Sequence, residues 1–192
     1  MKIVLSWLRE FCPTEAPAEE LAELLTSRGA KVEEILRPWE RLSGVVVARV
    51  LEVRDHPDSD KLSLARVTTG STEREVVVGV RNMHAGDLVP LAGPGATVPA
   101  LAEPLEEREI RGVRSDGMLC SPFELAITQE HTGILILPAE LEPGLDVRRA
   151  FGLDDAVLDI EVTQNRPDFM SVVGVAREAA AVTGVPFTLP RV

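Results

Sequence analysis

Arg108-Glu-Ile-Arg-Gly-Val-Arg-Ser-Asp-Gly-Met-Leu-Cys-Ser121 is the most distinctive stretch of the chain. It opens with a short strand pattern, turns at its glycines and closes on an apolar run at residues 118–120. Its three arginines, Arg108, Arg111 and Arg114, gather positive charge in a chain whose net charge is −11. Local positive charge in an acidic protein indicates a contact for phosphate or another anion. The alternative is that these arginines only pair with the acidic side chains nearby.

The sequence around this stretch, residues 40–150, predicts many short strands and almost no helix. A Val-rich run from Val45 to Val53, an alternating run from Leu62 to Thr68 and a third run from Glu75 to Gly79 are separated by polar or Gly-containing turns. Further strands are expected at 87–91, 107–113 and 133–137. Short strands broken by Gly and Pro are typical of a small closed or partly closed barrel.

The two flanks, residues 1–39 and 151–192, have α/β character and are each too small to bury a core alone. The first predicts a strand, a helix that Ser6 caps, a second helix after Pro17 and another strand. The second predicts a strand at 157–162 and a helix that Asn165 or Asp168 caps, although residues 165–168 could instead form an interaction site. Trp7, Phe11 and Phe169 are expected in the core. We therefore expect an α+β protein in which the 40–150 barrel is inserted into one discontinuous α/β domain.

Composition narrows the possible functions. The N-terminal apolar run Ile3-Val4-Leu5 is too short for a signal-peptide core or a membrane span, so a soluble, cytoplasmic protein is expected. Cys12 and Cys120 form no CxxC pair and have no metal-ligand spacing to a histidine, which favours two buried thiols over zinc or a disulfide. The carboxylate-rich segment from Asp55 to Lys61 lacks the glycine and the closing glutamate of a calcium loop and is interpreted as a turn.

No catalytic constellation is visible in the sequence. Gly93-Pro94-Gly95 matches neither a dinucleotide fingerprint nor a phosphate-binding loop, and residues 112–117 have the wrong spacing for a nucleophile elbow. Residues 40–150 carry 12 basic and 18 acidic side chains, so nucleic-acid binding must depend on a local patch. The chain has no tyrosine and few other aromatic residues on which bases could stack.

Several motifs resemble the beta subunit of bacterial phenylalanyl-tRNA synthetase. The opening Met1-Lys-Ile-Val-Leu-Ser-Trp-Leu-Arg-Glu-Phe11 is similar to the start of that subunit. His56-Pro-Asp-Ser-Asp-Lys-Leu62, Val78-Gly-Val-Arg-Asn82 and the 112–121 part of the distinctive stretch resemble its tRNA-binding barrel, which also occurs in methionyl-tRNA synthetases and in free-standing tRNA binders. The segment from Leu158 to Asp168 resembles the part that follows the barrel.

The resemblance implies an oligonucleotide-binding-type barrel inserted into a discontinuous α/β domain. It also implies a cytoplasmic heterotetramer of two alpha and two beta subunits that attaches phenylalanine to tRNA with ATP and magnesium, with the catalytic centre in the alpha subunit. Beta subunits of this family are several times longer, so this chain would correspond to an N-terminal part. We expect no cofactor, metal or catalytic residue within it, and no DNA or membrane as a partner.

Two functions remain open: accessory tRNA binding with subunit assembly, or a purely structural protein-interaction module without RNA contact. If tRNA is bound, cationic side chains would contact phosphate, and Asn82 and Ser115 would add hydrogen bonds. The residues expected at such a site are Lys61, Arg66, Arg81, Asn82, Arg108, Arg111, Arg114 and Ser115.

Overall fold

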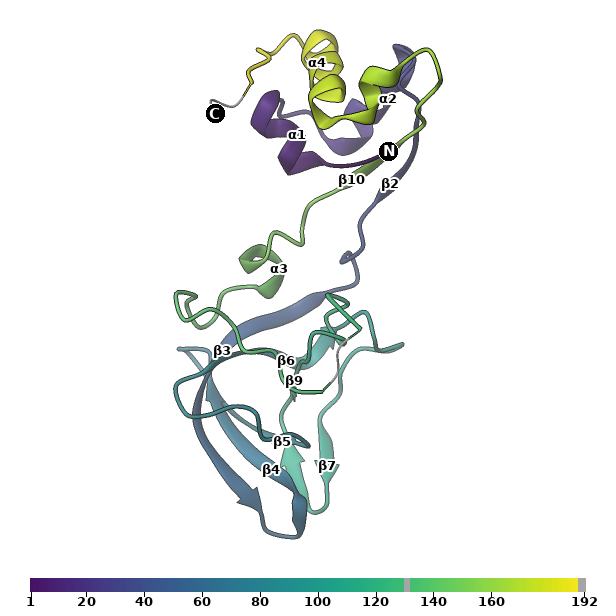
Figure 1. The fold of residues 1–192 in the computed structure, drawn as a ribbon. Coiled ribbons are helices and arrows are strands. Elements are labelled where there is room, and N and C mark those ends of the chain that lie inside the picture. Colours follow the sequence, from purple (N-terminus) through teal and green to yellow (C-terminus); the bar gives the residue numbers. More distant parts are fainter. Residues whose placement is uncertain (130–131, 190–192) are drawn as a thin grey trace. The chain divides into compact units, whose positions relative to one another are not determined.

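The computed structural model describes residues 1–129 and 132–189, and the chain divides into two compact units. The first unit combines Met1–Pro38 with the C-terminal part that begins at Asp154, and the second is Trp39–Leu153. Both contain antiparallel sheet together with helix, which makes this a mixed α and β protein (Figure 1).

The first unit is built on a three-stranded antiparallel sheet to which both ends of the chain contribute. Its order is β1-β10-β2, with β1 at Lys2–Val4, β10 at Val157–Ile160 and β2 at Val32–Leu36. Along β10 the buried side chains alternate with partly exposed ones, so Leu158 and Ile160 point into the core. The middle strand of this sheet thus comes from the part of the chain that follows the second unit.

Helices pack on the buried face of this sheet (Figure 1). They are α1 (Leu5–Phe11), α2 (Ala18–Ser27), the 3₁₀ turn η1 (Pro167–Met170) and α4 (Val172–Thr183). The apolar stripe of α2, which includes Leu21 and Leu25, meets Ala176 and Ala179 of α4 in one core cluster. Small alanines on α4 allow helices to approach closely where a larger side chain would hold them apart.

Both expected helix caps in this unit are wrong. Ser6 lies inside α1, and its backbone N–H donates instead to the Asp155 carboxylate at 3.1 and 3.2 Å. α4 is capped by Ser171, whose Oγ accepts from the N–H of Gly174 at 3.1 Å. Asp168 takes part in an ion pair with Arg166 at 2.9 Å. The pKa of the Asp168 carboxyl is lowered mainly by the hydrogen bond from that guanidinium.

Among the three aromatic residues expected in the core, Trp7 is the exception. Phe11 and Phe169 are buried, but the Trp7 side chain is 49% exposed on the outer side of α1. The Arg166 guanidinium lies 3.7 Å from the centre of the Phe169 ring and also bonds Glu178 of α4 at 3.0 Å. Because Arg166 bridges η1 and α4, it fixes the turn that leads into the last helix.

The second unit contains a five-stranded antiparallel sheet in the order β5-β4-β3-β6-β9. A separate β7–β8 hairpin and the short helix α3 (Val147–Ala150) complete it. The strands are β3 (Ser43–His56), β4 (Ser59–Thr68), β5 (Glu73–Val78), β6 (Leu88–Thr97), β7 (Arg108–Ile110), β8 (Val113–Ser115) and β9 (Met118–Leu119).

All five strands of this sheet contribute to one core cluster. Val50 of β3, Val67 of β4, Val76 of β5, Leu91 of β6 and Leu119 of β9 are buried in it together. No ladder joins β5 to β9 in the described residues, so by hydrogen bonding the sheet is open there. A sheet whose two outermost strands share one core must curve strongly.

Three of the expected elements in this unit differ from the structure. The polar segment 55–61 is mostly strand, because β3 runs to His56 and β4 begins at Ser59. The strand expected at 107–113 is a hairpin that turns at Arg111 and Gly112, whose φ values are 48° and 77°. Residues 133–137 form no strand and contribute a single bridge from Leu137 to Leu88.

None of the helices in residues 1–129 and 132–189 is long and apolar enough to cross a membrane.

Candidate nucleic-acid interface

The tips of the β3–β4 and β7–β8 hairpins are joined by a buried histidine. His56 is 4% exposed, its Nδ1 accepts from the backbone N–H of Asp58 at 3.1 Å, and its Nε2 lies 3.3 Å from the carbonyl oxygen of Ile110. An Nδ1 that accepts leaves the proton on Nε2, so the neutral ring donates to Ile110. This side chain therefore holds the two tips together, as their proximity in Figure 1 illustrates.

Lys61 and Arg111 line a hollow between these tips. Its other walls are residues 57–60, and its volume is about 380 Å³. Neither cation has an ion pair among the residues that the structure describes, although Asp58 and Asp60 also line the hollow. Arg111 has a φ of 48°, a left-handed conformation that side chains other than glycine rarely adopt. Positive φ at both central positions, Arg111 and Gly112, matches the tight turn that joins twisted antiparallel strands.

Arg81 reaches the same hairpin tip. It donates to the carbonyl oxygen of Asp60 at 3.3 Å and forms an ion pair with Asp55 at 2.8 Å. The structure thus brings together three of the expected site residues, Lys61, Arg81 and Arg111, from segments that are distant in the sequence. The carboxylate of Asp55 neutralises one of these three charges.

Two other arginines of the expected site are held by two carboxylates each. Arg66 pairs with Glu52 at 3.5 Å and Glu73 at 3.2 Å. Arg114 pairs with Glu107 at 2.6 Å and Asp116 at 2.8 Å, and these partners, Glu107 foremost, raise the pKa of its guanidinium. Arg108 is exposed on β7 and has no ion pair with any described residue.

The two uncharged residues of the expected site are bonded to backbone groups. Asn82 donates to the carbonyl oxygen of Ile134 at 2.8 Å and accepts from the Ile134 N–H at 3.0 Å. The buried Ser115 hydroxyl accepts from the N–H of Val77 at 3.1 Å and donates to the carbonyl oxygen of Gly117 at 3.0 Å. The Asn82 side chain therefore connects two loops and keeps a second amide N–H. The Ser115 side chain connects β8 to β5, and its one hydroxyl proton is used.

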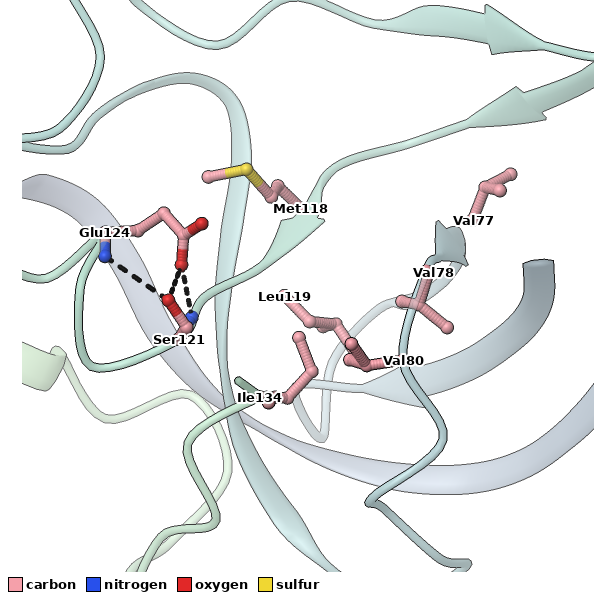
Figure 2. A pocket seen from close by; sticks show the side chains of 10 residues that line it. Val77, Val78, Val80, Met118, Leu119, Ser121, Glu124 and Ile134 are labelled. Carbon is pink, nitrogen blue, oxygen red and sulfur yellow. Dashed lines mark hydrogen bonds between the residues drawn. The ribbon is translucent and has the colours of Figure 1, made fainter. Parts of the chain in front are cut away.

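A second hollow, which the sequence did not indicate, lies between the outer strands β5 and β9 (Figure 2). Val78, Val80, Leu119 and Ile134 are among its apolar walls, and its volume is about 210 Å³. At one side the Glu124 carboxylate accepts from the backbone N–H of Ser121 at 2.6 Å and also from its hydroxyl. In return, the Glu124 N–H donates to the Ser121 Oγ at 3.4 Å. The Ser-x-x-Glu spacing at 121–124 is the sequence signal for this reciprocal bonding.

Groups of three or more histidine, cysteine or acidic side chains that could hold a metal ion do not occur among the described residues. The thiols of Cys12 and Cys120 are both buried and free. Burial raises the pKa of the Cys120 thiol to about 12, with a smaller contribution from the Glu124 charge. A thiol held in its neutral form is a poor nucleophile and a poor metal ligand.

Comparison with known proteins identifies the second unit. The family model described as "Putative tRNA binding domain" matches residues 45–146, which cover more than half of the chain. The chain belongs to this tRNA-binding domain family. Both hairpin tips and the hollow lined by Lys61 and Arg111 lie inside the matched range.

Longer relatives of this tRNA-binding domain chain carry one shared name. Proteins named phenylalanine–tRNA ligase beta subunit are 43% identical over 192 residues in Syntrophus aciditrophicus and 45% identical over 192 residues in Anaeromyxobacter dehalogenans. Each match covers all of this chain and 24% of the relative, so the chain spans about a quarter of their length.

A solved structure of a MetRS-related protein from Pyrococcus horikoshii is also similar. It is 24% identical, and the match covers 54% of this chain and 87% of that one. The TM-score of this match is 0.40.

Proposed function

We propose that the second unit binds tRNA and that Lys61, Arg81 and Arg111 at the joined hairpin tips contact its phosphates. The observation that carries the proposal is the family match over residues 45–146. Two of these three cations have no carboxylate partner in the described part of the chain. The strained backbone at Arg111 supports the same assignment, because strain of this kind is common at functional positions. The role of the other expected residues remains a prediction for Arg66, Asn82, Arg108, Arg114 and Ser115. Arg108 is the strongest candidate among them because it has no ion pair with a described residue.

We also propose a partly closed barrel of the oligonucleotide-binding type for this unit. The shared core of all five strands and the hollow between β5 and β9 support it, since a curved sheet with a gap would produce both. In that fold, the connection between the first two strands and the long connection before the last strand are used for binding. Here these are the turn after His56 and the segment that contains the β7–β8 hairpin.

At the level of the whole protein, we propose that the chain forms part of a phenylalanine–tRNA ligase beta subunit in the cytoplasm. Identities of 43–45% along the whole chain support this. Alpha subunits would be its partners in an assembly of two alpha and two beta chains, and ATP and magnesium would serve a catalytic centre outside this chain. This chain would be a non-catalytic accessory segment.

The binding is expected to be weak and steeply dependent on salt. Acidic residues outnumber basic ones, and four arginines of the second unit, Arg54, Arg66, Arg81 and Arg114, are already paired with carboxylates, so only a few phosphates can be neutralised. Each phosphate contact that is lost should lower the slope of log affinity against log salt by about 0.7 to 0.9.

The test is a titration of labelled tRNA at low and at physiological salt. A double variant, Lys61→Gln with Arg111→Gln, should weaken binding at low salt by about tenfold or more and flatten the salt dependence. A control with the same change in net charge is Lys2→Gln with Arg28→Gln, two exposed residues of the first unit without ion pairs to described residues. The control separates a local contact from the general effect of charge.

The alternative function is a structural module that only meets other protein chains. The pairing of Arg66, Arg81 and Arg114 with carboxylates favours it, because these cations already have partners. An absence of tRNA binding at both salt concentrations would refute our proposal and leave this alternative. Equal loss of binding in the two double variants would refute the assignment to the hairpin tips.

A further inference from the structure

A third hollow lies at the opposite end of β4 from the hairpin tips. The turn that follows β4 contributes Thr69, Ser71 and Thr72, β5 contributes Arg74, and neighbouring strands contribute their small residues. The volume is about 340 Å³, and the remaining lining residues are Gly44, Val46, Leu91, Gly93, Pro94 and Gly144. The lining contains one arginine and no aspartate or glutamate from the described residues, which sets it apart from the hollow at Lys61.

Arg74 is only partly bonded within the protein. Its Nη1 donates to the carbonyl oxygen of Asp116 at 3.3 Å, and it has no ion pair with a described residue. Its guanidinium lies against Gly93 of β6, where an added Cβ would be 3.9 Å from both Cζ and Nη2. A guanidinium carries five N–H donors, so most of the donors of Arg74 remain for a ligand.

Three hydroxyl groups line the hollow beside this arginine and are hydrogen-bonded within the turn. The Thr69 Oγ1 lies 3.3 Å from the Ser71 Oγ and 3.0 Å from the Thr72 Oγ1. The Thr72 N–H also donates to Thr69 Oγ1 at 3.3 Å, so the Thr69 oxygen is the centre of the group. Each hydroxyl has one proton, and the two links between hydroxyls use two of the three. The third proton has an acceptor in the same turn, because the Thr69 hydroxyl donates to the carbonyl oxygen of Thr72 at 3.4 Å. Ser71 and Thr72 would rotate their hydroxyls to donate to a ligand.

We propose that this hollow, formed by Arg74 with the hydroxyls of residues 69–72, binds a phosphate group. A planar fork of charged donors next to hydroxyl donors matches the oxygens of phosphate, and no lining carboxylate repels it. The phosphate belongs either to an RNA backbone or to free inorganic phosphate, and both present the same oxygens. From Lys61 to Thr69 the strand rise gives a separation of roughly 26 Å, so this pocket is distinct from the hairpin tips.

The first experiment is a titration with inorganic phosphate against chloride at constant ionic strength, without RNA. Backbone amide signals of Thr69–Thr72 and Gly93 and the Arg74 side-chain signal should shift and saturate in the millimolar range. Arg74→Gln should weaken the binding about tenfold, because a charge-assisted donor is lost. Gly93→Glu keeps Arg74 but places a carboxylate beside its guanidinium, and it should cause a similar loss. Arg28→Gln in the first unit is the control and should bind phosphate as the parent does.

The second arm identifies the source of the phosphate. If tRNA suppresses the phosphate-induced shifts, the ligand is a backbone phosphate of RNA; if it does not, the pocket takes free phosphate, and both results support a phosphate site. The proposal is overturned if the parent protein shows no saturable shift, or if Arg74→Gln and Gly93→Glu bind phosphate as the parent does. The titration with inorganic phosphate contains no RNA. If it fails, the proposal that Lys61 and Arg111 contact tRNA is still tested by the separate tRNA titration.

Discussion

Replacing Gly117 by alanine should destabilise the second unit strongly. A Cβ at this position would lie 2.6 Å from the carbonyl oxygen of Ala92 and 3.2 Å from the Leu91 Cδ1, and the residue has a φ of 156°. To reach an ordinary carbon–oxygen contact distance, the new Cβ and the Ala92 oxygen would have to move apart by roughly 0.7 Å. This oxygen belongs to Ala92 of β6, which pairs with Met118 of β9. Moving it would therefore disturb the pairing of the two strands.

The expected loss in the free energy of unfolding is about 2–4 kcal/mol, from overpacking against backbone and from backbone strain. A domain is typically stable by about 5–15 kcal/mol, so this loss is easily measured. Gly79→Ala is the matched control in the same unit, because nothing lies within 4 Å of a Cβ there. It should change the stability by less than about 1 kcal/mol.

Tryptophan fluorescence during denaturant unfolding can follow this unit alone. The chain has two tryptophans, Trp7 in the first unit and Trp39 in the second. Trp7 is half exposed and can be changed to phenylalanine, which leaves Trp39, whose indole donates to the Leu125 carbonyl at 3.0 Å. Equal denaturation midpoints for Gly117→Ala and Gly79→Ala in this background would refute the close approach of residues 117 and 92.

Three other perturbations test separate features. Gly174→Ala would normally favour a helix, but a Cβ there would lie 2.0 Å from the carbonyl oxygen of Asp168, so we expect a loss of about 2–4 kcal/mol in chemical unfolding of the first unit, and a gain would contradict the contact. The Cys120 thiol has a folded pKa of about 12 against an ordinary value of 9.0, so its contribution to stability is complete below pH 9 and declines as the pH rises from 9 to 12. In Cys120→Ala the free energy of unfolding, measured from unfolding curves between pH 9 and 12, should no longer show this decline, which amounts to up to about 1.4 kcal/mol per pH unit. If the variant shows the same decline as the parent, the thiol is not its source. Arg111→Asn should stabilise the second unit by up to about 1 kcal/mol, because asparagine tolerates a positive φ better than arginine. The same variant should bind tRNA more weakly. A lower stability would contradict backbone strain at residue 111.

The strands of the second unit were largely predictable from local pattern. The Val-rich run that became β3 and the alternation that became β4 gave both the type and the approximate place of each strand. The resemblance to a tRNA-binding domain was confirmed by the family match, since its motifs at 56–62 and 112–121 lie within the matched residues.

Long-range partners could not be predicted from the sequence. The N-terminus of α1 is satisfied by Asp155, a residue 149 positions away from Ser6, and no local pattern reveals such a pairing. Whether an arginine is free depends on strand register in the same way. Arg66 lies across from Glu52 in the β3–β4 pairing, which gives it a carboxylate partner, whereas Lys61 near the tip of the same hairpin has none among the described residues.

The position of β10 in the middle of the first sheet also determines the order in which the chain can assemble. During synthesis β1 and β2 leave the ribosome first but cannot form their sheet until residues 157–160 have followed. The intervening unit is complete earlier, and its folding brings Arg148 within 3.2 Å of the Leu42 carbonyl. The loop that separates β2 from β10 then shrinks from roughly 120 residues to about 15, which lowers its closure cost by about 2 kcal/mol. We therefore expect prior folding of the tRNA-binding unit to favour closure of the first sheet.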